Sequence, residues 1–299
     1  MTLEQLRIFV AVAEREHMTR AAEALNLTQS ATSAAIAALE ERHDVKLFDR
    51  VGRRIVLTQT GHAFLDEARA VLARATLATQ ALDDLAGLRR GQLRLGASQT
   101  VANYWLPRLM QAFRLAHPGV TLDLQIGNTE QIAEAVADLS VDLGIVEGAP
   151  QRNDLNQTAV TGDRTALIVP KGHEWTGKPP KTGEDFRAAS WVLREPGSGT
   201  RAMLEDLLAR HGLGLGDLDV ALELPSNEAV RAAVQAGAGA SLLSILVAEP
   251  SIMAGTVCEV AIDLPPRSFY ILRHKERHET GLEQAFIRLA DAQGPKAEA

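Results

Sequence analysis

A stretch without proline, from Thr60 to about Leu88, carries apolar residues at helical spacing along its whole length. A helix of about 28 residues rises roughly 42 Å at 1.5 Å per residue. One face of such a helix is apolar, and a second copy of the same helix is the simplest surface that buries it. The sequence therefore predicts a dimer formed through this helix. Its apolar positions are Phe64, Ala68, Val71, Leu72, Ala75, Ala78, Leu82 and Leu85.

Residues 1–60 have the spacing of three short helices followed by a hairpin. A predicted N-cap at Thr19 opens the second helix, 20–25, and another at Thr28 opens the third, which begins at Gln29. The segments 47–50 and 55–57 predict a two-stranded hairpin, or wing. This order predicts a winged helix-turn-helix. Apolar residues recur at helical spacing in the first helix at Leu3, Leu6, Val10 and Ala13, and the row of the third helix that is expected to pack inward is Thr32, Ile36, Leu39 and His43.

After residue 91 the pattern changes to strands that alternate with helices, which predicts a parallel sheet. The last strand and helix are expected to return to the first lobe, with crossovers near Gly162 and Pro265. The prediction is a two-lobed α/β domain, with lobe 1 at about 91–162 and 267–299 and lobe 2 at about 163–266. The strand-like segments are 93–97, 121–127, 142–146, 166–169, 191–193, 220–224, 240–243, 257–262 and 268–273.

Short motifs in the first 50 residues give the chain a resemblance to the LysR-type transcriptional regulators. They are Leu3-x-x-Leu6-x-x-Phe9, Met18-Thr19-Arg20-Ala21-Ala22-Glu23-Ala24-Leu25, Thr28-Gln29-Ser30-Ala31, Ile36-x-x-Leu39-Glu40 and Leu47-Phe48-Asp49-Arg50. The resemblance implies an N-terminal all-α winged helix-turn-helix at 1–60, a dimerising linker helix and hinge at 61–90, and a two-lobed effector domain like a periplasmic binding protein at 91–299. It also implies a homotetramer that binds double-stranded promoter DNA.

On this resemblance, the outward face of the third helix reads base edges in the major groove, and arginines on the wing neutralise phosphates. The sequence departs from the commoner family pattern in two places. Ala34 and Ala37 stand where many relatives carry basic residues, and His43-Asp44 replaces a usual Leu-Gly pair, so Asp44 must adopt the left-handed backbone. The candidate DNA contacts are Thr28, Gln29, Ser30, Ser33, Ala34, Ala37, Arg50, Arg53 and Arg54.

Polar residues at the starts of helices in the α/β domain suggest a site for a small anion, because first-turn N–H groups are unsatisfied and the helix dipole favours negative charge. Glu147, at the end of a strand, would repel an anion if it pointed inward. Ordinary capping explains Asn128 and Ser226 equally well. The candidate effector contacts are Ser98, Gln99, Thr100, Asn128, Glu147, Ser198, Gly199, Thr200, Arg201, Ser226 and Asn227.

The phrases 96–100 and 194–201 resemble the CysL-like and CbbR-like branch of the family. Members of that branch respond to small oxyanions of sulfur or to phosphorylated and carboxylated metabolites. The positions of Ser98, Thr100, Ser198 and Thr200 resemble the effector contacts of that branch. A cleft with many hydroxyls and few charges favours a compact oxyanion, so sulfite, sulfate or a short carboxylate is the hypothesis.

Other functions find less support in the sequence. An enzyme using a triad of Ser98, His173 and Asp142, or a solute-binding protein, remains as the alternative. Neither a metal nor a cofactor is expected, since His274 and His278 lie in a charged loop and Gly237-Ala238-Gly239 follows a predicted helix.

Composition and charge narrow the class further. The one cysteine, Cys258, is interpreted as a core residue. With charges in the first 16 residues and no apolar run long enough for a membrane span, we expect a cytoplasmic protein. The net charge of −7 argues against binding nucleic acid through overall charge, so any contact with DNA must be local.

Overall fold

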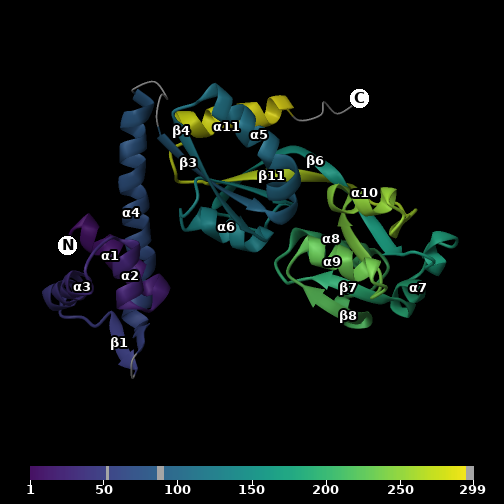
Figure 1. Cartoon of the computed structure of the whole chain (residues 1–299), viewed down its shortest axis with the longest axis horizontal. Coiled ribbons are helices and arrows are strands. Elements are labelled where there is room, and N and C mark those ends of the chain that lie inside the picture. Colours follow the sequence, from purple (N-terminus) through teal and green to yellow (C-terminus); the bar gives the residue numbers. More distant parts are fainter. Residues whose placement is uncertain (52–53, 86–90, 294–299) are drawn as a thin grey trace. The chain divides into compact units, whose positions relative to one another are not determined.

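The structure, a computed structural model, describes residues 1–51, 54–85 and 91–293 (Figure 1). These residues form two compact units. We call the first the helical unit and the second, which contains the described elements from β3 onward, the two-lobed unit. The helical unit is composed of α1 (Leu3–Arg15), α2 (Met18–Ala24), α3 (Gln29–His43), β1 (Phe48–Val51), β2 (Arg54–Leu57) and α4 (Gln59–Leu85).

The helical unit has one apolar core shared by its helices and the hairpin. Phe9 of α1 lies at its centre, with its ring 5.5 Å from that of Phe48 in β1 and 4.9 Å from that of Phe64 in α4. Ile36 and Leu39 of α3 complete the core. The hairpin is antiparallel, as β1 pairs with β2. The predicted winged helix-turn-helix is therefore confirmed.

Two details of the predicted helix ends are wrong. The N-cap of α2 is His17, whose Nδ1 accepts a hydrogen bond of 3.4 Å from the N–H of Arg20, so the helix begins before Thr19. His43 is exposed rather than buried, because α3 ends there and the backbone turns. That turn does use Asp44 in the left-handed conformation, with φ 52°, as predicted.

The long helix α4 agrees with the predicted stretch over its described length. Leu72 packs against the core of the helical unit, whereas Val71 is 41% exposed. The side chains of Leu82 and Leu85, the predicted hinge at 86–90 and Arg53 of the wing lie outside the described residues. Across the described ranges, no helix combines the length and the apolar character needed to cross a membrane.

Lobe 1 of the two-lobed unit is a mixed sheet covered on both faces. β3 lies between β4 and β5 and runs parallel to both, whereas β11 is antiparallel to β5 and to β6. The predicted parallel sheet is confirmed for β3, β4 and β5, and β6 and β11 extend it with antiparallel pairs. The elements of this lobe are β3 (Gly91–Ser98), a π-helical turn (Val101–Trp105), α5 (Leu106–Ala116), β4 (Val120–Gly127), α6 (Thr129–Ala137), β5 (Leu143–Glu147), part of β6 (Leu155–Pro170), β11 (Pro266–His274) and α11 (Gly281–Gln293).

The two faces of this sheet have separate apolar layers. Phe113 of α5 and Phe286 of α11 pack together, 5.3 Å between ring centroids, over one face. Ile132 and Val136 of α6 cover the other face. Because β3 is parallel to β4 and β5, the carboxyl ends of these strands and the N-terminus of α6, which follows β4, lie at one edge of the sheet.

Lobe 2 is built around the second half of β6, which pairs with β9 and β10. A parallel pair, β7 and β8, lies beside it. Two helices of this lobe, α7 and α10, are absent from the sequence prediction. The elements of lobe 2 are α7 (Gly183–Ala188), β7 (Ser190–Arg194), α8 (Gly199–Arg210), β8 (Asp219–Leu224), α9 (Asn227–Gln235), β9 (Ser241–Ser244), α10 (Ile245–Met253) and β10 (Val257–Val260), with 3₁₀ turns at Glu174–Thr176 and Leu215–Asp217.

The lobes are joined by continuous strand. β6 is 16 residues long and pairs with β11 before it reaches β9 and β10. Gly162 lies at this crossing, where a Cβ atom would come within 1.7 Å of the carbonyl oxygen of Arg267. Only glycine fits so close an approach of two backbones. The sequence analysis expected a crossover near Gly162, which is confirmed, but assigned no strand to 155–165.

Candidate functional site

The predicted reading face of α3 is open to solvent. Gln29, Ala34 and Ala37 are exposed, and Ser33 is half-buried. Thr28 and Ser30 are exposed, but their hydroxyls are already hydrogen-bonded. Thr28 Oγ1 accepts from the N–H of Ala31 at 3.2 Å and lies 3.1 Å from Ser30 Oγ. The backbones of Arg50 and Arg54 lie in β1 and β2, and Arg53 is outside the described residues. The helix therefore offers a small, neutral surface.

Glu40 fixes the wing against the end of α3, a role that the sequence analysis did not identify. Its Oε1 accepts hydrogen bonds from the N–H groups of Leu47 at 2.7 Å and Phe48 at 3.2 Å. A carboxylate that accepts two backbone N–H bonds holds them more strongly than a neutral acceptor would. Glu40 is thus a positioning residue for the hairpin.

In the two-lobed unit, the residues after β3 bond directly to the start of α9. Gln99 donates from Nε2 to the carbonyl of Pro225 at 2.7 Å and accepts from the N–H of Asn227 at 3.1 Å. Asn227 Nδ2 donates to Thr100 Oγ1 at 3.0 Å. Ser98 Oγ is buried and has no hydrogen-bond partner among the described residues. Most of these predicted contacts therefore hold the lobes to each other.

A second set of contacts between the lobes centres on Glu195. Asn128 Nδ2 donates to Glu195 Oε1 at 3.3 Å and to the carbonyl of Pro196 at 3.2 Å. Arg194, which is 4% exposed, donates from Nε and Nη2 to the two carboxylate oxygens of Glu195 at 2.7 and 2.8 Å, and from Nη1 to Asn227. Burial raises the pKa of Glu195, but the hydrogen bonds and charge of Arg194 lower it more, so the net pKa lies below its usual value.

Arg194 is absent from the sequence-based candidates, because an arginine within a strand gives no sign that it is buried.

Ser226, a candidate effector contact, caps a helix instead. Its Oγ accepts a hydrogen bond of 3.3 Å from the N–H of Ala229, so Ser226 is the N-cap of α9.

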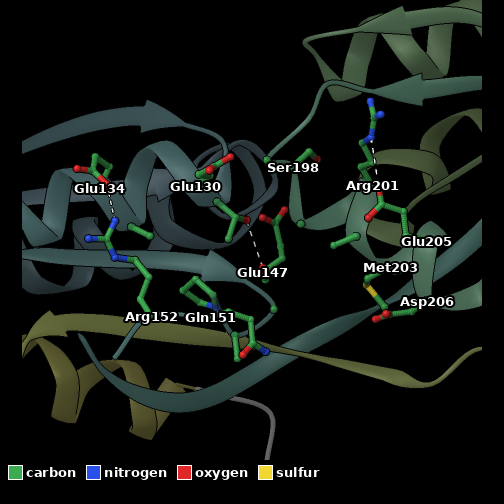
Figure 2. A pocket seen from close by; sticks show the side chains of 18 residues that line it. Glu130, Glu134, Glu147, Gln151, Arg152, Ser198, Arg201, Met203, Glu205 and Asp206 are labelled. Carbon is green, nitrogen blue, oxygen red and sulfur yellow. Dashed lines mark hydrogen bonds and ion pairs between the residues drawn. The ribbon is translucent and has the colours of Figure 1, made fainter. Parts of the chain in front are cut away.

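A pocket of about 560 Å³ opens between the lobes, beside the start of α8 (Figure 2). Among the candidate residues, Glu147, Ser198, Gly199 and Arg201 line it. Ser98, Gln99, Thr100, Asn128, Thr200, Ser226 and Asn227 do not. The residues of the lining that the sequence analysis missed are Thr129, Glu130, Ala133, Glu134, Gly148, Ala149, Pro150, Gln151, Arg152, Gly197, Ala202, Met203, Glu205 and Asp206.

The N-terminus of α8 has no side-chain cap. Its N-cap residue, Ser198, is 4% exposed, and no hydrogen bond to its hydroxyl is found in the described part of the chain. Gly199 must be small, because a Cβ there would lie 2.6 Å from the carbonyl oxygen of Glu147 and 2.8 Å from Thr129 Oγ1. The first turn of a helix leaves its N–H groups unsatisfied. The N–H groups of the first turn of α8 lie at the wall of the pocket.

Arg201 adds positive charge near the start of α8, but its guanidinium is already hydrogen-bonded to other residues of the protein. Its Nη1 donates to the carbonyl of Arg194 at 3.0 Å and to Glu223 at 2.5 Å, and its Nε donates to Glu205 at 3.3 Å. The donors available at this wall are therefore the hydroxyl of Ser198 and the backbone of α8.

Glu147 points into the pocket from the end of β5 (Figure 2). It is 4% exposed, and its Oε1 lies 4.0 Å from Nη1 of Arg267. Arg267 in turn donates to both carboxylate oxygens of Asp163, each at 2.6 Å, and Asp163 also accepts from Ser244. Arg267 and Asp163 lie outside the residues that line the pocket, and the carboxylates of Glu147 and Asp163 thus share one guanidinium.

The remaining features from the sequence do not form sites. Asp142 pairs with Arg94 and Arg277, and His173 Nδ1 accepts from the N–H of Trp175, so neither is placed as part of a triad with Ser98. The described residues contain no group of three or more His, Cys, Asp or Glu side chains able to hold a metal. Cys258 is half-buried against the core of lobe 2.

Comparison with known proteins identifies both units. Residues 3–62 match the family described as bacterial regulatory helix-turn-helix protein, lysR family, and residues 86–294 match the LysR substrate binding domain. An uncharacterized transcriptional regulator of Escherichia coli K12, YeiE, is 35% identical over 97% of each chain. The regulator CbbR of Rhodospirillum rubrum is 33% identical over 97% of this chain and 96% of that one. The regulatory domain of Synechocystis CcmR, solved in complex with 2-PG, is 28% identical with a TM-score of 0.61, and the match covers 70% of this chain and all of that one.

The chain therefore belongs to the LysR family of transcriptional regulators. It is a DNA-binding regulator with an effector-binding domain, the two-lobed unit. The resemblance stated from the sequence, including that to the CbbR-like branch, is confirmed. The alternatives of an enzyme or a solute-binding protein are wrong, because the relatives are transcriptional regulators and the helix-turn-helix is present.

Proposed function

We propose that this regulator binds promoter DNA in response to a small anion held in the pocket between its lobes. The candidate ligands are a sulfur oxyanion such as sulfite or sulfate, a small carboxylate, and a phosphorylated metabolite. The relative in complex with 2-PG supports a small-molecule ligand for a domain of this kind. The protein acts in the cytoplasm, where promoter DNA lies.

The observation that carries the proposal is the uncapped start of α8. This helix is 12 residues long, and it starts at the pocket with unsatisfied N–H groups and with the N-cap residue Ser198, whose hydroxyl makes no capping hydrogen bond. An anion at this point gains hydrogen bonds and the favourable end of the helix dipole. By contrast, α9 is capped by Ser226, and Asn128 accepts from the N–H of Gln131 at 3.0 Å at the start of α6.

On the DNA side, the exposed neutral face of α3 supports reading of base edges, and the wing arginines supply phosphate contacts. The candidate residues are those named from the sequence, with Gln29 and Ser33 as hydrogen-bonding groups. Domain roles follow the predicted boundaries, with DNA binding in 1–60, a linker in 61–90 and effector binding in 91–299.

Self-association uses α4 together with α1. Leu3 and Val71 are 49% and 41% exposed, and a groove beside them is lined by Leu3, Glu4, Arg7, Leu72, Ala75 and Thr76. Apolar residues along a solvent-facing helix favour packing against a second copy. The dimer formed in this way pairs again to a tetramer. The ligand acts by binding one arrangement of the assembly more tightly than the other.

A thermal-shift series on the full chain tests the effector site. Ligand at a hundred times its Kd stabilises a protein by about 2.7 kcal/mol. We expect at least one of sulfite, sulfate, phosphate, glycine and acetate to raise the melting temperature, and Ser198→Ala to reduce that rise while leaving DNA binding without ligand intact. Ser268→Ala, at an exposed position on β11, is the matched control. A full response of Ser198→Ala, or no response of the wild type to any anion, would refute the site.

A further inference from the structure

The geometry of the pocket points to a selection rule for its ligand: we propose that the ligand is a small oxyanion that carries a hydrogen-bond donor of its own, and that the carboxylate of Glu147 accepts from that donor. The inference rests on the proposed effector pocket. It adds the chemistry of the group opposite the anion and assigns Glu147 as the residue that determines specificity.

The side chain of Glu147 is buried, and its carboxylate accepts no hydrogen bond from the described residues. Its backbone carbonyl accepts from Thr129 Oγ1 at 3.2 Å, but no hydrogen bond to its carboxylate is found within residues 1–51, 54–85 and 91–293. The only cationic group within 4.0 Å of it in those ranges is Arg267. A buried charge without hydrogen bonds is costly, so a donor delivered by a ligand is stabilising here.

Arg267 makes its hydrogen bonds to Asp163 and none to Glu147, because its Nη1, which has no hydrogen-bond partner in the described residues, lies 4.0 Å from Glu147 Oε1. The side chains of Arg267 and Asp163 are 2% and 4% exposed, and two hydrogen bonds of 2.6 Å join them in the parallel, bidentate arrangement. Two carboxylates therefore share one guanidinium, which leaves one negative charge in excess. The excess negative charge lies at Glu147, because its carboxylate is farther from the guanidinium of Arg267 than the carboxylate of Asp163 is.

The acceptor and the anion site lie close to each other on the pocket wall. A Cβ at Gly199, the first residue of α8, would lie 2.6 Å from the carbonyl oxygen of Glu147. Ser198 and Glu147 both line the pocket (Figure 2). One compact ligand can therefore place its anionic oxygens at the start of α8 and its donor at Glu147.

The rest of the lining disfavours an anion that lacks a donor. Arg152 is occupied by Glu134 and Asp154, and Arg201 is occupied by Glu205 and Glu223. No ion pair is found for Glu130 or Asp206 in the described ranges, and both also line the pocket. Sulfate, which has no proton at neutral pH, meets only repulsion at Glu147.

Two ligand pairs of matched size separate the possible donors. Phosphate keeps at least one proton at neutral pH, whereas sulfate of the same shape keeps none. Glycine adds an ammonium group to the carboxylate of acetate. The shared chemistry is an oxyanion with a donor, and the two pairs distinguish an acidic O–H from an ammonium N–H as its source.

The experiment measures Kd for these four ligands with the full chain, by calorimetry at pH 7. A hydrogen bond to a charged group contributes about 1.5 to 3 kcal/mol, so we expect the donor-bearing member of at least one pair to bind roughly ten- to a hundredfold more tightly. Glu147→Gln should remove that preference and improve binding of the donor-free member. Glu134→Gln, which removes a carboxylate already paired with Arg152, should keep the preference of the wild type.

Equal binding of the members within both pairs, or a preference that survives in Glu147→Gln, overturns the inference and leaves the anion site standing. Absence of binding by all four ligands overturns the inference, and it overturns the proposed pocket as well when sulfite also gives no thermal shift. A gain of sulfate or acetate binding by Glu147→Gln also shows that the variant is folded, so loss of structure cannot imitate the expected result.

Discussion

The side-chain amide of Asn227, at the start of α9, donates a hydrogen bond of 3.0 Å to the hydroxyl of Thr100, which follows β3. Both residues are fully buried, with exposures of 0%. Thr100→Val would keep the shape but leave the Asn227 amide without this partner, at a cost of about 1 to 3 kcal/mol. We expect a lower melting temperature, by several degrees, in a calorimetric scan of the full chain.

Thr121→Val is the control for that change. Thr121 lies on β4 and is exposed, so the same loss of a hydroxyl should leave the melting temperature nearly unchanged. Equal melting temperatures of Thr100→Val and the wild type would show that the hydrogen bond between Asn227 and Thr100 does not contribute to stability.

The exposed face of α3 predicts a variant that loses DNA without losing its fold. Ala34→Glu places a carboxylate on a solvent-exposed helical position, where it should repel phosphates and block close approach to the groove. We expect affinity for promoter DNA to fall about tenfold or more in a fluorescence titration at constant salt, with an unchanged melting temperature. Ala188→Glu, an exposed alanine of α7, should bind as the wild type does. Undiminished binding by Ala34→Glu would remove α3 from the interface.

Leu3 tests the self-association surface. Leu3→Glu puts a charge into the predicted contact of α1 and α4, where burial without a partner is unfavourable. We expect light scattering coupled to gel filtration to show a smaller assembly at the same protein concentration. Met253→Glu, at a side chain that is 82% exposed in α10, serves as the control and should not change the mass. An unaltered mass for Leu3→Glu would place the interface elsewhere.

A buried acid gives the protein a defined pH dependence. Glu283 and Asp142 are both fully buried and share Arg277, whose Nη2 lies 2.8 Å from an oxygen of each. Arg94, bonded to Asp142, and Arg273 add positive charge. Burial raises the pKa of Glu283 from 4.5 to about 7, against the lowering effect of Arg277.

Because the folded protein holds this proton more tightly than the unfolded chain, the contribution to stability is full below pH 4.5 and is lost as pH rises through 7. The loss amounts to at most about 3 kcal/mol. We expect the free energy of unfolding to fall between pH 5 and 8, and Glu283→Gln to flatten that fall. Glu276→Gln, at an exposed glutamate, should retain the wild-type slope. A slope that is the same in Glu283→Gln would assign the titration to another group.

The helical unit was largely predictable because its signals are local. Thr28 is the N-cap of α3, Ile36 and Leu39 are buried, and Asp44 adopts the left-handed backbone, all as the sequence predicts. The hydrogen bonds of Glu40 were not predictable in this way, because its partners Leu47 and Phe48 become neighbours only when the hairpin folds back.

The pocket depends on pairings between distant parts of the chain, and there the sequence is less informative. Helix starts at Asn128, Ser198 and Ser226 look equivalent in sequence, yet Ser226 caps its helix and Ser198 does not. The polar first half of β6 resembles a loop until β11 pairs with it, and Arg267, which meets Glu147, has no local signal of its burial.

The strands that join the lobes also limit how a bound ligand can act. β6 and β11 are hydrogen-bonded to each other from Leu155 to Arg164, so the connection resists stretching and sliding far better than two flexible tethers would. The register shifts between Arg267 and Phe269, opposite the glycine at 162. Motion of one lobe against the other must therefore be a twist or bend concentrated at this point. A ligand that displaces the side chain of Arg267 therefore acts directly on the segment where the lobes are joined.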